Sequence, residues 1–269
     1  MTVVDCHCHI YPAKIAQRAV EGVGAFYGIA MDVPDGTPKA LLAACANSPI
    51  THHIVHSVAT RADQVATIND FIAQTCAEQP NMIGFMTLHQ DMEDPAAEIA
   101  RAQALGLVGI KLHPDTQRVN MDDPRLMRIY ELAEGRLPII MHCGDYRYDF
   151  SHPRRMRAVL DAFPNLVVNA AHFGGWSIYD LAVEYLEDAR CFLDISSSMA
   201  FIGLRRTAEL IELYGPDRIL FGSDFPMWDP VAEYEQFASL PFSAADKEKM
   251  TWRNAERFLG RALAEAPSA

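Results

Sequence analysis

Residues 3–9 read Val3-Val4-Asp5-Cys6-His7-Cys8-His9. Two β-branched residues open this stretch and Tyr11-Pro12 follows it, a pattern that predicts a short buried strand. Because successive side chains of a strand point to opposite faces, we expect Asp5, His7 and His9 on one face and the two cysteines on the other. Two imidazoles two positions apart on a rigid strand can bind one metal ion, and the cysteines would point away from it.

Beyond this stretch the chain alternates short apolar runs with helical patterns. Strands are predicted at residues 3–9, 52–58, 82–88, 107–113, 138–142, 166–171, 191–195 and 218–221. Eight such units are typical of a parallel sheet buried on both faces. In 269 residues they predict a (β/α)₈ barrel that forms one domain over residues 1–269. The alternative is an open doubly wound sheet, which usually carries a glycine-rich phosphate loop after its first strand; no such loop follows His9 here.

Helices are expected between these strands. The first covers residues 13–20, and the stretch from Gly22 to Pro38, rich in glycine and proline, is predicted to be loop. Two helical segments follow Pro230 after the last strand.

Composition argues against several classes of partner and location. The formal net charge is −12 and no basic patch stands out, which disfavours nucleic acid and anionic membrane as partners. No apolar run approaches the ~20 residues that span a bilayer, and no secretory signal is recognisable. Six cysteines without a CxxC pair are typical of reduced thiols. We therefore expect a cytoplasmic protein acting on a small molecule; whether it forms a homodimer stays open.

Polar residues able to bind a metal close five of the eight predicted strands. They are His7 and His9 of the first strand, Lys111 and His113 of the fourth, His142 of the fifth, His172 of the sixth and Asp224 of the eighth. In such a barrel the chemistry takes place at the C-terminal ends of the strands. Nitrogen and oxygen ligands without sulfur suit zinc, manganese or iron, with zinc the default. The sequence therefore predicts a metal-centred site drawn from several strands.

These strand ends resemble the motifs of the amidohydrolase superfamily, and more narrowly its "amidohydrolase 2" branch, which includes aminocarboxymuconate-semialdehyde decarboxylase. The matching segments are His7-x-His9, Gly109-Ile110-Lys111-Leu112-His113-Pro114, His142-x-Gly144, His172-Phe173-Gly174-Gly175 and Gly222-Ser223-Asp224-Phe225-Pro226. The resemblance implies a metal-dependent barrel enzyme. Its members hydrolyse esters, lactones or amides, or remove a carboxylate from unsaturated acids.

The resemblance also implies roles for single residues. The ligands of one divalent metal ion would be His7, His9, His142 and Asp224. His172 matches the catalytic histidine beside the metal-activated water, and Asp224 could share that water's proton. Lys111 matches either the carboxylated lysine that bridges two metals in dinuclear members or a residue that binds substrate. We expect one ion per chain, with both roles of Lys111 left open.

Three residues are candidates for substrate binding. Lys111 and His113 share a face of the predicted fourth strand, and Arg147 lies in the loop after the fifth. Lysine and arginine both bind carboxylates, so a small substrate with at least one carboxylate is expected. Asp5 is expected either to bond a ligand histidine or to pack. The other histidines of the second and third strands are expected to pack or cap: His52, His53, His56 and His89.

Three functions remain in competition. The first is a hydrolase that uses a metal-activated water on a small ester, lactone or amide, and the second is a nonoxidative decarboxylase of an unsaturated or aromatic acid. The third is a non-catalytic zinc protein, which the lack of a thiolate-rich site disfavours. The absence of a large insertion that could build an aromatic pocket favours the hydrolase over the decarboxylase.

Overall fold

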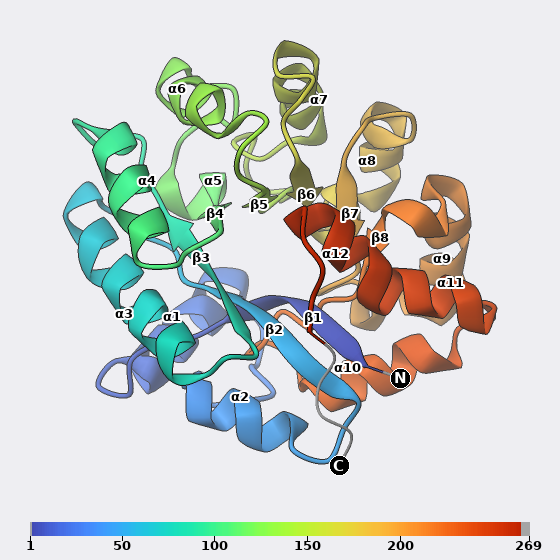
Figure 1. The fold of residues 1–269 in the computed structure, drawn as a ribbon. Helices are drawn as coiled ribbons and strands as arrows, with labels where there is room; N and C mark the ends of the chain where they lie inside the picture. Colours follow the sequence, from blue (N-terminus) through green and yellow to red (C-terminus); the bar gives the residue numbers. More distant parts are fainter. Residues whose placement is uncertain (1, 265–269) are drawn as a thin grey trace.

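The computed structural model describes residues 2–264, in which eight parallel strands form one sheet in the order β1 to β8. The sheet closes on itself because β1 also bonds the segment that follows β8. Cys6 N donates to Phe221 O across 2.9 Å, and His9 N donates to Phe225 O across 2.7 Å. The predicted (β/α)₈ barrel is confirmed (Figure 1).

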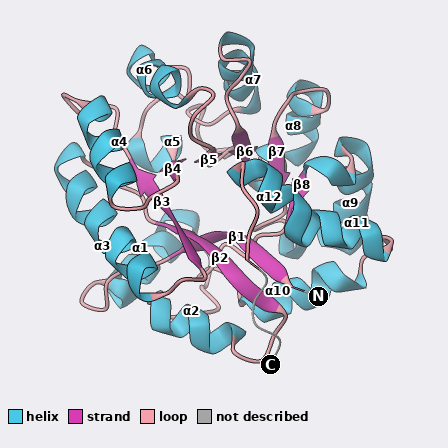
Figure 2. Cartoon of the chain, in the orientation of Figure 1, coloured by secondary structure: helices cyan, strands magenta, loops and turns pink. Residues whose placement is uncertain are grey.

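The strands are β1 Val3–His9, β2 Ile50–His56, β3 Met82–Thr87, β4 Gly109–Leu112, β5 Ile139–Met141, β6 Val168–Ala170, β7 Phe192–Asp194 and β8 Ile219–Leu220. The longer helices are α1 Ala16–Tyr27, α2 Pro38–Cys45, α3 Val65–Glu78, α4 Pro95–Ala104, α6 Pro124–Ala133, α7 Pro153–Ala162, α8 Tyr179–Leu186, α9 Met199–Tyr214 and α10 Pro230–Ser239. The shorter ones are α5 Pro114–Gln117, α11 Ala244–Glu248 and α12 Asn254–Leu259. Most helices form a ring outside the strands (Figure 2).

Several of these helices begin at the same sequence signal, a capping side chain followed by proline. Asp94, Asp123 and Asp229 each accept a hydrogen bond from a backbone N–H of the first turn, and a proline follows each of them. The side chain satisfies a backbone donor that the helix leaves free, and proline has no N–H to satisfy at that position. The signal therefore fixes where α4, α6 and α10 start.

The apolar side chains form two cores. The larger lies between the sheet and the helices, and the smaller fills the barrel interior with residues such as Val4, Ile54 and Phe85. Trp252 and Phe258, from the C-terminal helical segment, pack onto this inner core. One end of the barrel is therefore sealed by apolar packing, and the polar strand ends lie at the other.

Strand β1 departs from the regular alternation predicted for it. Its pairing with β2 shifts register between Asp5 and Cys8, which is a β-bulge. Cys6 consequently joins the inner core, while Asp5 lies with Cys8 and His53. Asp5 was predicted to share a face with His7 and His9, and Cys6 to share one with Cys8; both predictions are wrong. The extra residue of the bulge shifts the side chains after it to the opposite face of the strand. His7 and His9 still point into the barrel.

Helix α1 extends into the first part of the stretch predicted as loop, over residues 22–27. It continues to Tyr27 despite Gly22 and Gly24. A Cβ at Gly24 would lie 2.9 Å from the carbonyl oxygen of Ile29, so glycine there allows close packing against the following turn. Tertiary packing thus outweighs the low helix propensity of glycine, and α1 brings two aromatic residues to the polar end of the barrel.

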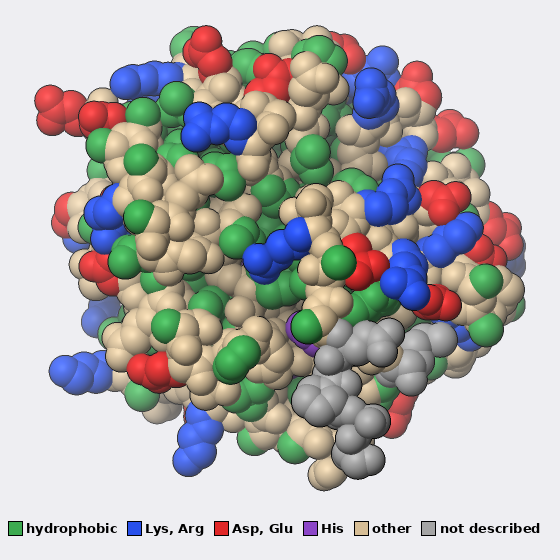
Figure 3. Space-filling view, in the orientation of Figure 1, with side chains coloured by type: hydrophobic (Ala, Val, Ile, Leu, Met, Phe, Trp, Pro, Cys, Tyr) green, Lys and Arg blue, Asp and Glu red, His purple; other side chains and the backbone are tan. Residues whose placement is uncertain are grey.

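The surface carries charges of both signs. On the face seen in Figure 3, lysine and arginine side chains are interspersed with aspartate and glutamate. Within residues 2–264, no helix is both long and apolar enough to cross a membrane.

Candidate active site

Three of the predicted metal ligands meet at the C-terminal end of the barrel. His7 Nε2 lies 3.4 Å and His9 Nε2 3.5 Å from Oδ1 of Asp224. The backbone enforces this meeting, because Asp224 N donates to the carbonyl oxygen of His7 across 2.9 Å. Two imidazole nitrogens and a carboxylate oxygen so placed can share one divalent ion.

The ring of His7 is oriented by Asp194, at the end of β7. His7 Nδ1 lies 2.9 Å from Asp194 Oδ2, which also accepts a hydrogen bond from Asn169 Nδ2 at 2.8 Å. Burial opposes ionisation of Asp194, yet its contacts with the rings of His7 and His172 and the hydrogen bond from the Ser196 hydroxyl hold its pKa well below the usual value. The N–H of His7 is thus at Nδ1, and the lone pair of Nε2 faces the other ligands. Sequence reasoning missed Asp194; the signal was an acidic residue ending a buried strand.

Lys111 lies directly against this ligand. It is fully buried, and its Nζ is 2.9 Å from Nε2 of His7. Burial lowers the pKa of Lys111 to about 8, although the charges of Asp224 and Asp194 oppose this. Lys111 Nζ therefore lies at hydrogen-bond distance from the His7 nitrogen that faces Asp224.

His142, the fourth predicted ligand, points toward His172. Nδ1 of His142 lies 3.1 Å from Nε2 of His172, and its Nε2 lies 3.0 Å from the carbonyl oxygen of Gly144. His172 Nδ1 lies 2.9 Å from the carbonyl oxygen of Ser196. If each neutral ring donates its one N–H to a carbonyl, two lone pairs face each other, an arrangement that a proton or cation between them stabilises. Burial keeps the pKa of both rings low. The structure thus places His142 beside the expected catalytic histidine rather than beside His7 and His9.

Several residues around these ligands adopt positive φ angles, which are uncommon for residues other than glycine. They are Arg118 (φ 55°), His172 (58°), Phe173 (53°), Ser177 (63°), Ser197 (49°) and Asp224 (61°). Such backbone conformations cost about 1–3 kcal/mol each and gather at functional sites. The expected proton-transfer residue and one expected ligand are both among them.

Asp5 supports this site through the backbone. Its Oδ1 accepts hydrogen bonds from the backbone N–H of Ser223 at 2.9 Å and of His7 at 3.2 Å. Its Oδ2 accepts from the Ser223 hydroxyl at 2.5 Å. Of the two roles considered for Asp5, a bond to a ligand's ring is not what the structure shows. Asp5 instead ties β1 to the turn that carries Asp224.

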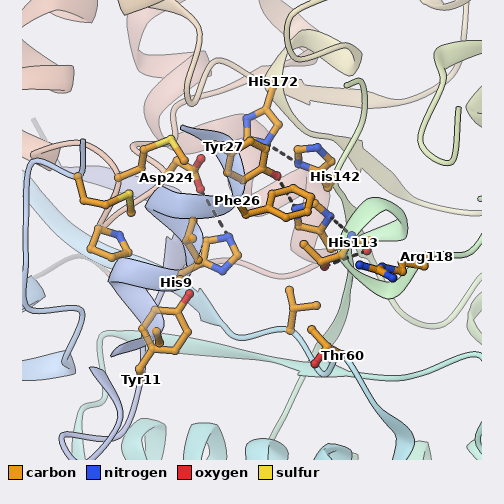
Figure 4. Close-up of a pocket in the computed structure, with 18 residues that line it drawn as sticks. His9, Tyr11, Phe26, Tyr27, Thr60, His113, Arg118, His142, His172 and Asp224 are labelled. Atoms are coloured by element: carbon orange, nitrogen blue, oxygen red, sulfur yellow. Dashed lines mark hydrogen bonds and ion pairs between the residues drawn. The ribbon is translucent and has the colours of Figure 1, made fainter. Parts of the chain in front are cut away.

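A cavity of about 360 Å³ opens above the cluster, and His9, His113, His142, His172 and Asp224 line it (Figure 4). Helix α1 forms an apolar wall of this cavity with Val23, Phe26 and Tyr27. The Tyr27 hydroxyl lies 2.8 Å from Nε2 of His113, and the His113 ring stacks on that of His142 with centroids 3.8 Å apart.

The charged residues expected to bind substrate occupy different positions. Lys111 lies beneath His7 and does not line the cavity, and Arg147 forms an ion pair with Asp145 at 2.7 Å. Arg147 also donates to the backbone oxygen of Phe26 at 2.5 Å, so it fastens α1. Arg118, just after α5, does line the cavity. Among the described residues its guanidinium has no hydrogen-bond or ion-pair partner. Sequence reasoning missed Arg118; the signal was an arginine following the predicted fourth strand.

His56, at the end of β2, also belongs to the site. Its ring lies edge-on to those of His7 and His9, with centroids 5.0 and 4.4 Å away. His56 was expected to pack or cap, and its ring does pack, but against two of the predicted metal ligands. The alternation along β2 places His56 on the same inward face as Ile54, and this could have been read from the sequence.

Comparisons with known proteins concern the family and the fold. A family model described as amidohydrolase matches residues 4–261. An uncharacterized TIM-barrel protein from Bordetella bronchiseptica has a TM-score of 0.75 at 20% identity, over 97% of this chain and 99% of that one. A dihydroxybenzoic acid decarboxylase from Polaromonas, solved with manganese and 2-nitroresorcinol, gives 0.73 at 18%, over 96% and 97%. A candidate 2-pyrone-4,6-dicarboxylic acid hydrolase from Pseudomonas putida gives 0.66 at 19%, over 98% and 99%. At such identities the likeness concerns the fold alone.

Proposed function

We propose that this chain, which belongs to the amidohydrolase family, hydrolyses a small carboxylate-bearing ester, lactone or amide with the help of one divalent metal ion, zinc by default. The observation that carries the proposal is the convergence of His7, His9 and Asp224 beside a cavity that His9, Asp224, His172 and Arg118 line, with Arg118 unpaired among the described residues. A site for activating water and a site for an anion are thereby joined in one cavity.

The donor set fits a divalent ion. His7, His9 and Asp224 offer converging nitrogen and oxygen atoms. His142, the fourth ligand that the resemblance implies, lies beside His172 in this structure. When bound, the ion would polarise the scissile carbonyl and make an adjacent water a stronger acid. Asp194 keeps the N–H of His7 on Nδ1, so that the lone pair is on Nε2. To act as a ligand, Nε2 would exchange its contact with Lys111 Nζ, 2.9 Å away, for the ion.

His172 is proposed to move the proton. Its Nδ1 is held by the carbonyl oxygen of Ser196, so the exchangeable position is Nε2. An imidazole with an unprotonated Nε2 can take a proton from water and return it to the leaving group. Asp224 is the second candidate for proton transfer, since its Oδ1 faces the same cluster.

Arg118 is proposed to bind the substrate carboxylate. It lines the cavity and leaves its planar pair of donors free, whereas Arg147 is neutralised by Asp145. Arg118 lies on the far side of His113 from His9 and Asp224 (Figure 4), so a substrate held there extends toward the ligands. Lys111 and Arg147 were expected to make this contact. Lys111 is buried outside the cavity and Arg147 is paired with Asp145, so Arg118 is the better candidate.

Decarboxylation of an unsaturated or aromatic acid is the second candidate, and one observation favours it. Phe26 and Tyr27 of α1 supply an aromatic wall that the sequence had not suggested. A planar acid would pack against this wall. His172, after taking a proton from water at Nε2, would give that proton to the carbon as the bond to the departing carbon dioxide breaks. The same residues therefore serve either reaction.

Two measurements test the proposal. Metal analysis of the purified protein should find about one divalent ion per chain. A panel of carboxylate-bearing lactones, esters and unsaturated acids is then assayed for release of acid and of carbon dioxide. Acid release without carbon dioxide is the expected result. Carbon dioxide release would assign the decarboxylase instead, and a protein without metal or turnover would contradict both.

A further inference from the structure

His56 sits between strands that carry proposed ligands. It ends β2, and in the parallel pairing of β1 with β2 it stands opposite His9. Its ring meets those of His9 and His7 at interplanar angles of 88° and 71°. One side-chain nitrogen from each of the three histidines lies within 4.8 Å of the other two. This is a separation at which three imidazoles can bind one ion.

Within residues 2–264, the ring nitrogens of His56 have no hydrogen-bond partner. The side chain is 0% exposed, and neither ring nitrogen has a hydrogen bond within the described part of the chain. Each buried polar atom left without a hydrogen bond lowers the stability of the folded protein by about 1–3 kcal/mol. The two unpaired nitrogens therefore make His56 less stabilising than an apolar side chain of similar size. Its neighbours differ: His7 bonds Asp194, and His172 bonds Ser196.

We infer that His56 is a further ligand of the metal centre, beside His7, His9 and Asp224. The inference rests on the metal dependence proposed above. A bond to the ion would satisfy one orphaned nitrogen of His56. His7, His9 and His56 are three neutral nitrogen donors from two adjacent strands, and Asp224 adds one oxygen. Zinc accepts four such donors and can expand to a fifth position, which the activated water would take.

The test measures metal binding rather than turnover. His56→Leu removes both nitrogens and keeps an apolar volume, and His56→Gln keeps a polar side chain. His52→Gln is the matched control, because His52 lies on the same strand but packs against Trp252, with ring centroids 5.2 Å apart. Zinc affinity is measured by competition with a chromophoric chelator. Thermal unfolding is recorded with and without zinc, and the visible spectrum is recorded with cobalt.

We expect both His56 variants to lose about 10²-fold or more in zinc affinity, and their cobalt spectra to differ from that of the unchanged protein. The metal-free His56→Leu variant should unfold no earlier than the metal-free parent, because it lacks the orphaned nitrogens. Its gain in Tm on adding zinc should be smaller. A packing role would instead lower the metal-free Tm and leave the affinity unchanged.

The outcomes separate the two proposals. If the unchanged protein binds no divalent ion, the proposed function fails. If it binds zinc and the His56 variants bind equally well, only the role of His56 is overturned. Should His56→Leu not fold, His56→Gln decides, and a cobalt spectrum identical to that of the parent would overturn the inference.

Discussion

The hydroxyl of Ser197 donates a hydrogen bond to Oδ2 of Asp224 across 2.6 Å. Trp228 Nε1 in turn donates to the Ser197 oxygen across 2.8 Å. These two hydrogen bonds hold Oδ2 of Asp224 in place and leave its Oδ1 directed at His7 and His9. Partners of this kind orient a ligand and adjust its basicity, so Ser197 is a positioning residue for the proposed metal centre.

Removal of this hydroxyl should weaken metal binding without unfolding the protein. We expect Ser197→Ala to lower zinc affinity about 10- to 100-fold, and Ser197→Thr to restore part of the loss. Chelator competition measures both. Ser198→Ala is the control, because the Ser198 hydroxyl bonds the carbonyl oxygen of Ser196 and not Asp224. Equal losses in the two alanine variants would refute the specific role of Ser197.

His172 and His142 should separate proton transfer from metal binding. Asparagine at His172 keeps a polar side chain of similar size but cannot exchange a proton, so we expect His172→Asn to retain its metal and lose about 10²-fold or more in turnover. His142→Ala should lose metal affinity. Metal content and kcat are measured on the same preparations. A His172→Asn protein that binds no metal would make His172 a ligand and reverse the assignment.

Arg118 should discriminate between anionic and neutral substrates. Losing a charge-assisted hydrogen bond costs about 1.5–3 kcal/mol, so Arg118→Met should lower kcat/KM for a carboxylate-bearing substrate about 10- to 100-fold. A neutral analogue of the same shape should be affected little. Steady-state kinetics on the pair measures the difference. Equal losses for both compounds would show that Arg118 does not bind the carboxylate.

Lys111→Met is the comparison for that experiment. Lys111 contacts the His7 ring and lies outside the cavity lining, so its replacement should affect the metal centre and therefore both substrates alike. If Lys111→Met lowered kcat/KM for the anionic substrate only, Lys111 would be the residue that binds the carboxylate, as expected from the sequence.

The barrel was predictable because its signals are local. Alternating apolar runs and capped helices define each unit, and parallel strands of such units place their C-terminal ends together. For that reason His7, His9 and Asp224 could be grouped from sequence although more than 200 residues separate the first from the last.

The remaining features of the site depend on contacts that the sequence does not display. The bulge in β1 reverses the faces of Asp5 and Cys6, and no residue pattern marks it. Helix α1 extends through glycines because of packing. The sequence does not show that Arg147 pairs with Asp145 or that Arg118 lines the cavity.

Glu233, on α10, should make stability depend on pH. Its side chain is buried, Oε2 has no hydrogen-bond partner in the described structure, and Oε1 accepts from Gln236 at 3.2 Å. Burial, with the negative charges of Asp32 and Asp5, raises the pKa of Glu233 to about 8. In the unfolded chain the pKa of a glutamate is about 4.3. Between these values the folded protein binds one more proton than the unfolded chain, so this residue's contribution to stability falls as the pH rises.

Replacing Glu233 by glutamine removes this contribution. We expect Glu233→Gln to match the parent near pH 4.5 and to become more stable as the pH approaches 8, by on the order of a few kcal/mol. That difference corresponds to a Tm higher by several degrees at pH 8. Thermal unfolding of the metal-free protein across this pH range measures it, because bound metal would itself shift Tm. Glu235→Gln, at an exposed position of the same helix, is the control and should follow the parent. If the Glu233→Gln and parent curves run parallel from pH 4.5 to 8, Glu233 is ionised in the folded protein throughout and the prediction is wrong.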